Sequence, residues 1–227
     1  MCDCFGSRTF YLRGVTDVPL REYIEELKKA YSREKSWTHC YLAFREAHEN
    51  RHADAETIDH LALHLSTFLS SWGMYRGSSF LFKYTDYKVH VPVVKIILKC
   101  EFDPLWKTQY APEDTALLWD LATEIKEYYQ HIRKEIGHPG TATHTLLTKI
   151  LLGTIGCIPA YDEKICSILR DLGKSASFNR NSLKEMLSLY QNNKEEVDQW
   201  RSAMEKAEEI PQYPYMRALD AYLWHRH

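Results

Sequence analysis

Residues 136–172 read IGHPGTATHTLLTKILLGTIGCIPAYDEKICSILRDL, and this segment determines how the middle of the chain folds. Gly137, Pro139 and Gly140 predict a tight turn, because glycine tolerates a positive φ and proline restricts φ. The apolar run after the turn predicts a short helix, and a second short helix is expected to begin at Asp162. The free backbone N–H groups at the start of the first helix would point out of the turn and form a phosphate site.

Outside this segment, apolar residues recur at helical spacing along most of the chain. Ser182 and Glu185, near the start of one such run, have the spacing of a capping box. Residues 73–90 show no clear period, and we expect a loop there and then a short helix after Pro92. We expect an all-α fold, with one compact helical domain over residues 1–227 and a division into two lobes left open. The remaining helices are predicted over residues 19–35, 37–52, 55–72, 112–134, 181–191, 194–208 and 215–227.

The composition is that of an ordinary globular protein. Hydrophobic residues make up 44% and charged residues 26% of the 227 residues, which excludes disordered, collagen-like and low-complexity classes. The formal net charge of −2 argues against an overall positive potential that would attract nucleic acid. It is compatible with a local strip of basic residues. Scattered cysteines, no apolar leader and no apolar run of about 18 residues predict a cytoplasmic protein with reduced thiols and no membrane contact.

The segment quoted first resembles the helix-hairpin-helix superfamily of base-excision DNA glycosylases. In that family a hairpin of the type hPGhGxxTA is followed by a helix, a Gly-x-Pro-type turn and an essential aspartate. Here PGTA at residues 139–142 matches the hairpin and Thr145 matches the family threonine. Asp162 follows Gly140 by 22 residues, which is the family spacing, and the apolar pattern IxxIL comes after it. The resemblance implies a helix-hairpin-helix motif within about residues 125–172.

The chain departs from the family pattern in several places. Ala142 replaces the second hairpin glycine, Glu163 follows the aspartate, and no four-cysteine iron–sulfur signature follows. His144 occupies the slot of the lysine that lyase-competent members use. The resemblance therefore implies a monofunctional enzyme, which hydrolyses a base from DNA and leaves an abasic site.

The resemblance also implies roles for individual residues. Cleavage of an N-glycosidic bond passes through an oxocarbenium-like sugar, which a carboxylate can stabilise while it orients or deprotonates water. Asp162 would carry this role and His144 would line the site, although Asp162 could also serve only as a helix cap. The implied partner is double-stranded DNA, bound by a monomer, with no cofactor beyond a monovalent cation bridging hairpin carbonyls. The DNA contacts are expected from Gly137, His138, Gly140, Thr141, Ala142, Thr145 and Lys149.

A base-flipping enzyme also needs a pocket and a wedge. Residues 71–79 (SWGMYRGSS) supply aromatic rings for stacking, an arginine for hydrogen bonding and glycines for close approach. We expect Trp72, Tyr75 and Arg76 to form the base pocket or wedge, while the two aromatic residues could also pack on a helix end. The excised base stays open: a damaged base would indicate repair, and a modified phage base would indicate antiviral defence.

Two other functions stay open. Arg45 and His52 resemble the Arg…His signature of the all-α HEPN ribonucleases, which act on RNA phosphates. His48 with His52 and His60 with His64 are i, i+4 pairs that lack a third ligand, so no metal site is expected. A non-catalytic helical adaptor or antitoxin would instead use an apolar stripe of the last helix, formed by Tyr215, Met216, Leu219, Tyr222, Leu223 and Trp224.

Overall fold

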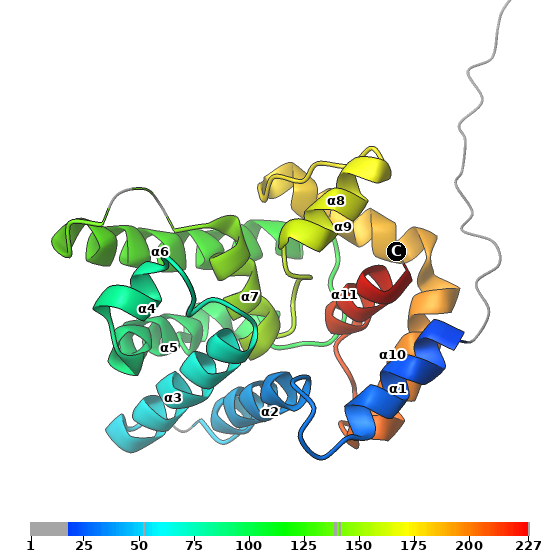
Figure 1. The fold of residues 1–227 in the computed structure, drawn as a ribbon, viewed down its shortest axis with the longest axis horizontal. Helices are drawn as coiled ribbons and strands as arrows, with labels where there is room; N and C mark the ends of the chain where they lie inside the picture. Colours follow the sequence, from blue (N-terminus) through cyan, green and yellow to red (C-terminus); the bar gives the residue numbers. More distant parts are fainter. Residues whose placement is uncertain (1–17, 52, 139, 141, 227) are drawn as a thin grey trace, which may run out of the picture.

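The computed structural model describes residues 18–51, 53–138, 140 and 142–226, and within these residues every regular element is a helix (Figure 1). The all-α expectation is therefore confirmed for this part of the chain. Two short 3-10 helices, η1 (Tyr87–His90) and η2 (Cys100–Leu105), flank α5. The α-helices are α1 (Val18–Lys28), α2 (Lys35–Glu49), α3 (Ala55–Ser71), α4 (Phe80–Tyr84), α5 (Val91–Ile97), α6 (Asp114–Glu135), α7 (His144–Thr154), α8 (Glu163–Asp171), α9 (Arg180–Asn192), α10 (Lys194–Glu208) and α11 (Tyr215–Arg226).

The helices form two groups that lie side by side (Figure 1). In one group α3 packs against α2, α5 and α7, and α6 covers α5 and α7. In the other group α1 packs against α10 and α11, so the first described helix lies beside the last two, and α8 also contacts α11. A single cluster of buried apolar residues runs through both groups, and the two groups therefore share one core.

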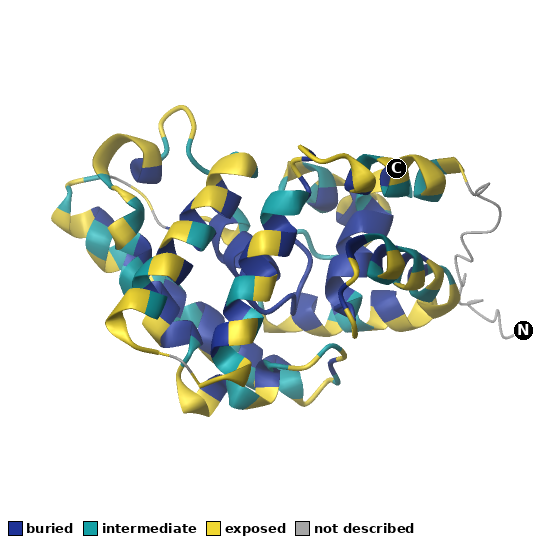
Figure 2. Cartoon of the chain, turned by 90° about the horizontal axis from the view of Figure 1, so that it is seen from below, coloured by how far each residue is buried: buried dark blue, intermediate teal, exposed yellow. Residues whose placement is uncertain are grey.

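Most helices bury one face and expose the opposite face (Figure 2), and the buried positions are mostly apolar. In α8, Ile165, Ile168 and Leu169 are buried, as the helical spacing predicts. The last helix, α11, differs because all of its residues from 216 to 223 are buried. Of the apolar stripe that an adaptor would use, four residues are buried in the core, and Tyr215 and Trp224 are partly buried against it.

Two local expectations are corrected by the structure. The segment before Pro92 is more helical than predicted, and α5 begins at Val91 with the proline in its first turn, where a missing N–H costs nothing. The N-cap of α9 is Asn179 rather than Ser182, which sits three residues later and completes a capping box with it. Asparagine and serine are equally good N-caps, and Asn179 takes the role because its backbone is extended where the helix begins. Glu185 accepts a hydrogen bond from Ser175 N at 2.9 Å.

The contact between α3 and α7 is unusually close at one glycine. A Cβ atom added to Gly153 would lie 2.3 Å from Cε1 of Phe68, so only glycine lets the two helices approach this far. Phe68 is fully buried and its ring has little room to move. This contact positions α7 against the C-terminal end of α3.

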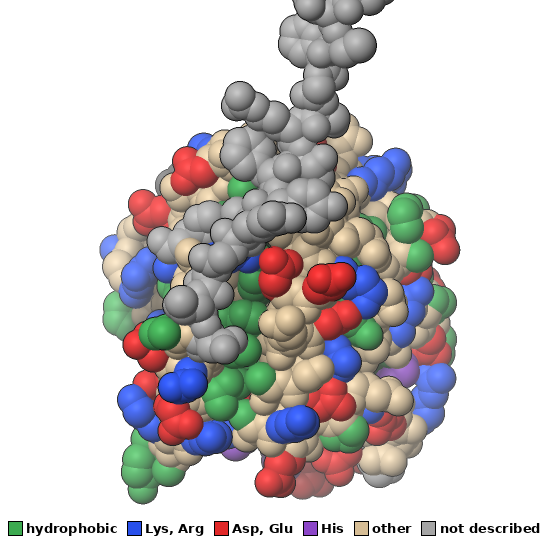
Figure 3. All heavy atoms as spheres, turned by 90° about the vertical axis from the view of Figure 1, so that its right-hand side faces the viewer, with side chains coloured by type: hydrophobic (Ala, Val, Ile, Leu, Met, Phe, Trp, Pro, Cys, Tyr) green, Lys and Arg blue, Asp and Glu red, His purple; other side chains and the backbone are tan. Residues whose placement is uncertain are grey.

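The surface carries mixed charge. Figure 3 shows acidic and basic side chains interspersed on the end of the molecule formed by α1 and α10, in line with the net charge of −2. In the described ranges, none of the helices combines the length and the apolar character that crossing a membrane requires.

Candidate active site

The loop between α6 and α7 contains two glycines in the left-handed region. Gly137 has a φ of 65° and Gly140 a φ of 88°, which glycine adopts without strain. Arg133 of α6 donates a hydrogen bond from Nε to the Gly140 carbonyl at 3.2 Å, so a guanidinium group lies against the loop. Pro139 and Thr141, which also carry the resemblance, lie outside the described residues.

Other contacts anchor the same loop to its surroundings. Nε2 of His138 lies 3.2 Å from the Ser78 carbonyl oxygen, and the His138 ring meets Tyr84 edge-on at 5.6 Å. Ala142 is buried, so its methyl group packs in the core at the position of the second hairpin glycine. Thr143 then caps α7 and leaves that helix with a defined first turn.

The turn that leads to residue 162 is held from two helices. Thr148 of α7 accepts a hydrogen bond from Tyr161 N at 2.8 Å, and Thr145 donates to the Tyr161 carbonyl at 2.9 Å. On the other side, Ala160 N donates to Oδ1 of Asp220 in α11 at 2.9 Å. The next side chain along the chain is therefore placed by both groups of helices.

Asp162 is the N-cap of α8. Its Oδ1 accepts a hydrogen bond from Ile165 N at 3.1 Å, and the positive end of the helix dipole favours a carboxylate there. The capping role that the sequence allowed is thus present. The side chain also lines a cavity, so capping does not exhaust what the carboxylate contacts.

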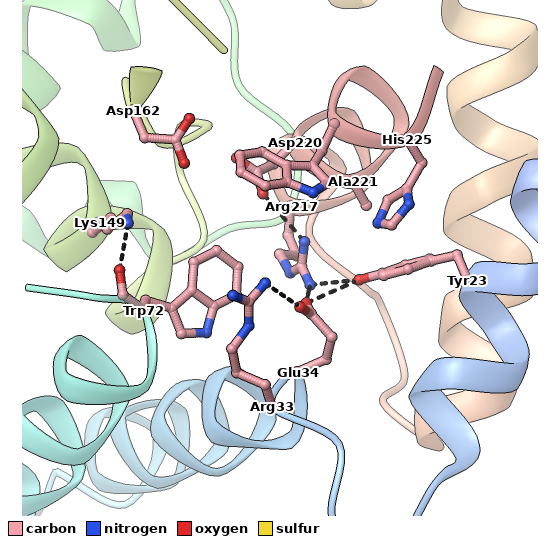
Figure 4. A pocket seen from close by; sticks show the side chains of 11 residues that line it. Tyr23, Arg33, Glu34, Trp72, Lys149, Asp162, Arg217, Asp220, Ala221 and His225 are labelled. Carbon is pink, nitrogen blue, oxygen red and sulfur yellow. Dashed lines mark hydrogen bonds and ion pairs between the residues drawn. The ribbon is translucent and has the colours of Figure 1, made fainter. Parts of the chain in front are cut away.

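This cavity lies where the two groups of helices meet (Figure 4). It has a volume of about 50 Å³ and lies between α1, the start of α2, and the facing parts of α3, α7, α8 and α11. All but one of its lining side chains are aromatic or charged. The lining residues are Tyr23, Arg33, Glu34, Trp72, Lys149, Asp162, Arg217, Asp220, Ala221, Trp224 and His225.

Lys149 lies on the Asp162 side of the cavity (Figure 4). Only 8% of the residue is exposed, and its Nζ donates a hydrogen bond to the Trp72 carbonyl at 2.6 Å. Burial lowers the pKa of Lys149 from its ordinary value, and the negative charges of Asp162 and Asp220 oppose that shift in part. A larger share of this amine is therefore neutral than in an exposed lysine.

The opposite side of the cavity is built on the buried guanidinium of Arg217. Nη2 contacts the Glu34 carboxylate at 2.7 Å and the Tyr23 hydroxyl at 2.6 Å, and Nη1 lies 3.3 Å from Asp220. Burial raises the pKa of Asp220 to about 7, although the charge of Arg217 pulls it down. Buried ion pairs are weak contributors to stability, and clusters of shifted pKa values are typical of functional sites.

Trp72 forms an aromatic wall between the two sides. The guanidinium carbons of Arg33 and Arg217 lie 5.7 and 5.4 Å from the centroid of its ring, within cation–π range. Trp72 Nε1 and Arg217 Nε are buried and have no hydrogen-bond partner among the described residues. Buried donors are nearly always paired, so these two N–H groups indicate where an acceptor on a bound ligand would be favoured.

The remaining residues predicted for the base pocket lie outside the cavity lining. The hydroxyl of Tyr75 contacts Ser66 Oγ at 3.1 Å and Nε2 of the buried His90 at 2.7 Å. Arg76 lies against the backbone at Gly73, where its Cζ would be 3.6 Å from an added Cβ. Of the three, the structure brings only Trp72 to Asp162.

His144 also lies outside this lining. Its Nδ1 accepts a hydrogen bond from Phe178 N at 3.3 Å, and the two rings meet edge-on at 6.0 Å. Burial, aided by the charge of Lys126, lowers the pKa of His144, so the ring is mostly neutral near pH 7. The expected catalytic pair of Asp162 and His144 does not share the cavity.

Several lining residues were missed by the sequence reading. Tyr23 and Glu34 come from the start of the chain and meet Arg217 across 194 and 183 residues, which no local pattern can reveal. One signal was present in the last helix, because Arg217 and Asp220 interrupt an otherwise apolar run at i, i+3 spacing. Charged residues on an apolar helix face are rarely buried unless they are paired.

The other candidate sites have less to support them. Arg45 is bound to Glu49 at 2.7 Å and to the Pro211 carbonyl at 2.9 Å, while His52 lies outside the described residues. Across the described ranges, no group of three or more His, Cys, Asp or Glu side chains is arranged to hold a metal ion. Comparison with protein-family models, curated proteins and solved structures gives no significant match to this chain.

Proposed function

We propose that this chain is a DNA N-glycosylase, which hydrolyses the bond between a damaged or modified base and its deoxyribose and leaves an abasic site. The observation that carries the proposal is the meeting of Asp162, Lys149 and Trp72 in one cavity. The sequence marked these three residues separately, as catalytic carboxylate, DNA contact and base-stacking ring. An enzyme that flips a base out of DNA needs this combination of carboxylate and aromatic wall in one pocket.

Asp162 is suited to stabilise positive charge on the sugar. Its Oδ1 is held by Ile165 N, which fixes the orientation of the carboxylate while the other oxygen can meet sugar or water. As the glycosidic bond breaks, charge develops on the deoxyribose ring, and a preoriented carboxylate lowers the free energy of that state. The same group can orient or deprotonate the attacking water. Water displaces the base in this step, as expected for a monofunctional enzyme with His144 in the family's lysine slot.

The cavity is smaller than a flipped base in this structure. Its volume of about 50 Å³ lies below the range of about 300–1,000 Å³ for small-ligand pockets, so entry of a base would require the lining side chains to move apart. The base would stack on Trp72, whose ring already faces two guanidinium groups. The unpartnered Nε–H of Arg217 would then donate to an acceptor atom on the base.

The proposed partner is double-stranded DNA in the cytoplasm, bound by a monomer. In this proposal residues 125–172 form the helix-hairpin-helix motif, and backbone N–H groups of the loop grip a phosphate. A monovalent cation would use loop carbonyls other than that of Gly140, which accepts from Arg133. Repair and antiviral defence differ only in the base excised, so the substrate separates them.

The test is release of a base from DNA. The protein is incubated with duplex DNAs that carry oxidised, alkylated or phage-type modified bases, and abasic sites are scored by alkaline cleavage. Asp162→Asn keeps the helix cap but removes the charge, whereas Asp171→Asn makes the same change on an exposed residue at the other end of α8. Wild type and Asp171→Asn should generate abasic sites, and Asp162→Asn should not.

Two results would reject the proposal. Abasic sites from Asp162→Asn at the wild-type rate would reduce Asp162 to a helix cap. Absence of both base release and DNA binding would exclude a DNA enzyme and favour the ribonuclease or adaptor alternatives. The adaptor alternative would then need a surface other than the buried α11.

A further inference from the structure

A second pocket, here called the α2 pocket, shares no lining residue with the cavity around Asp162. Its walls are the C-terminal part of α2, the loop after η2, the residue that ends α7 and the loop between α10 and α11. Its volume of about 380 Å³ falls within the range of about 300–1,000 Å³ for small-ligand pockets. The lining includes Arg45, His48, Arg51, Trp106, Lys107 and Gln212.

The α2 pocket is basic, since three cations line it together with one carboxylate: Arg45, Arg51, Lys107 and Glu49. Arg45 donates a hydrogen bond from Nε to Glu49 at 2.7 Å, and Arg51 donates from Nη1 to Asp103 at 2.6 Å. A guanidinium group carries five N–H donors in one plane, so both arginines are held in position and keep donors for a ligand. A phosphate group matches two such anchored guanidinium groups and a neighbouring ammonium group.

Two residues of the lining have an unfavourable backbone conformation. Arg51 has a φ of 53° and Gln212 a φ of 57°, in the left-handed region that favours glycine. Arg51 directly follows Asn50, the C-cap of α2, where glycine is the usual residue because it has no Cβ atom. Strain of this kind is concentrated at functional sites. The arginine therefore indicates a use for its guanidinium group that the turn alone does not require.

An aromatic wall stands beside these cations. The rings of His48 and Trp106 are stacked, with centroids 4.2 Å apart and planes inclined by 6°. Nε2 of His48 lies 2.9 Å from Asp103, so the carboxylate that holds Arg51 also holds this wall. A phosphate group alone would fill only a small part of the pocket, and aromatic side chains favour a planar ring in the remaining space.

We propose that the α2 pocket binds a nucleoside monophosphate. The phosphate lies between Arg45, Arg51 and Lys107, and the base packs against the wall formed by His48 and Trp106. Because one carboxylate already holds an arginine and the wall, few side chains have to be ordered when the ligand binds. The inference does not rest on the proposed function, since the two sites share no residue.

The test is isothermal titration calorimetry of the full chain with AMP, GMP, CMP and UMP. Each nucleotide is compared with its nucleoside and with inorganic phosphate. At least one nucleotide should bind at a single site with a Kd below about 1 mM. Its nucleoside and inorganic phosphate should bind at least about tenfold more weakly, because each makes only part of the contacts.

Arg51→Gly separates binding from folding. It removes the guanidinium group and also relieves the left-handed backbone, while the ion pair that it breaks is exposed and contributes little to stability. It should weaken nucleotide binding at least about tenfold with a Tm at or above that of wild type. Glu209→Gly is the matched control, because Glu209 has a φ of 57° at the end of α10 but lies outside the pocket lining. This variant should bind the nucleotide as wild type does.

Three results would overturn the inference. If no nucleotide binds more tightly than its nucleoside and phosphate, the pocket does not combine the two contacts. A folded Arg51→Gly with wild-type affinity would place the nucleotide elsewhere, and equal losses in Arg51→Gly and Glu209→Gly would exclude the guanidinium group as the cause. Lys107→Gln changes an exposed loop residue and should also weaken binding, so the inference stays testable if Arg51→Gly does not fold. Base release from DNA is measured separately, and its failure would leave this result unchanged.

Discussion

Gly153→Ala should destabilise the protein, although alanine is the better helix former. The added methyl carbon would lie 2.3 Å from Cε1 of Phe68, against an optimum of about 3.5–4.0 Å between carbons. Phe68 is fully buried, so α3 and α7 must move apart instead. Overpacking of this kind costs about 1–3 kcal/mol, and the gain in helix propensity returns about 1 kcal/mol. Subtracting that gain leaves a net loss of about 0–2 kcal/mol, and the 2.3 Å approach puts the expected value in the upper half of this net range, about 1–2 kcal/mol.

The assay is urea and thermal unfolding, in which each kcal/mol should lower the Tm by about 2–4 °C for a chain of this length. Phe68→Leu provides the control, because the shorter side chain removes the ring atoms nearest the new methyl group. In that background Gly153→Ala should cost less, and the difference measures the clash as a coupling free energy. A Gly153→Ala protein as stable as wild type in both backgrounds would refute the close approach of the two helices. The displacement should also move Lys149 against Trp72 and weaken any activity that uses the cavity.

Three further predictions concern the site and its support. Asp162→Ala should lower the free energy of unfolding by about 0.5–2 kcal/mol, because the helix cap is lost. Asp162→Asn should stay within about 0.3 kcal/mol of wild type in urea unfolding, because asparagine also caps helices. Equal losses in the two variants would contradict the capping geometry. Thr148→Val should cost about 1–3 kcal/mol and slow base release, because the buried Tyr161 N–H would lose its acceptor, and an unchanged Tm would count against that contact. Burial lowers the pKa of His90 to about 3, whereas an unfolded histidine has a pKa of about 6.5. Between these two pH values only the unfolded chain binds the proton. The free energy of unfolding should therefore fall as the pH drops below about 6.5. Urea midpoints near pH 7 and near pH 5 should therefore differ more for wild type than for His90→Gln, and an equal difference would reject the role of His90.

The residues that could be placed from the sequence are those determined by their near neighbours. Apolar spacing predicted α3 and most other helices, because a surface helix needs one apolar face. Asp162 was placed at a helix start, since its own side chain satisfies a free N–H group of the first turn. The cap of α9 was misassigned by three residues because Asn179 and Ser182 both suit that role and only the backbone path selects between them.

The cavity could not be predicted in the same way. Its far wall comes from Tyr23, Glu34 and Arg217, which meet across most of the length of the chain. Contacts at that separation depend on how α1 and α11 pack, which is a property of the whole core. Helical phase decided that Lys149 rather than His144 lines the cavity with Asp162, because the two residues lie five positions apart on α7 and face different sides of the helix. The sequence by itself determined most of the longer helices and the residue that caps α8. Only tertiary packing decided which side chains share the cavity with that residue, because burial selects partners by position in space rather than by order along the chain.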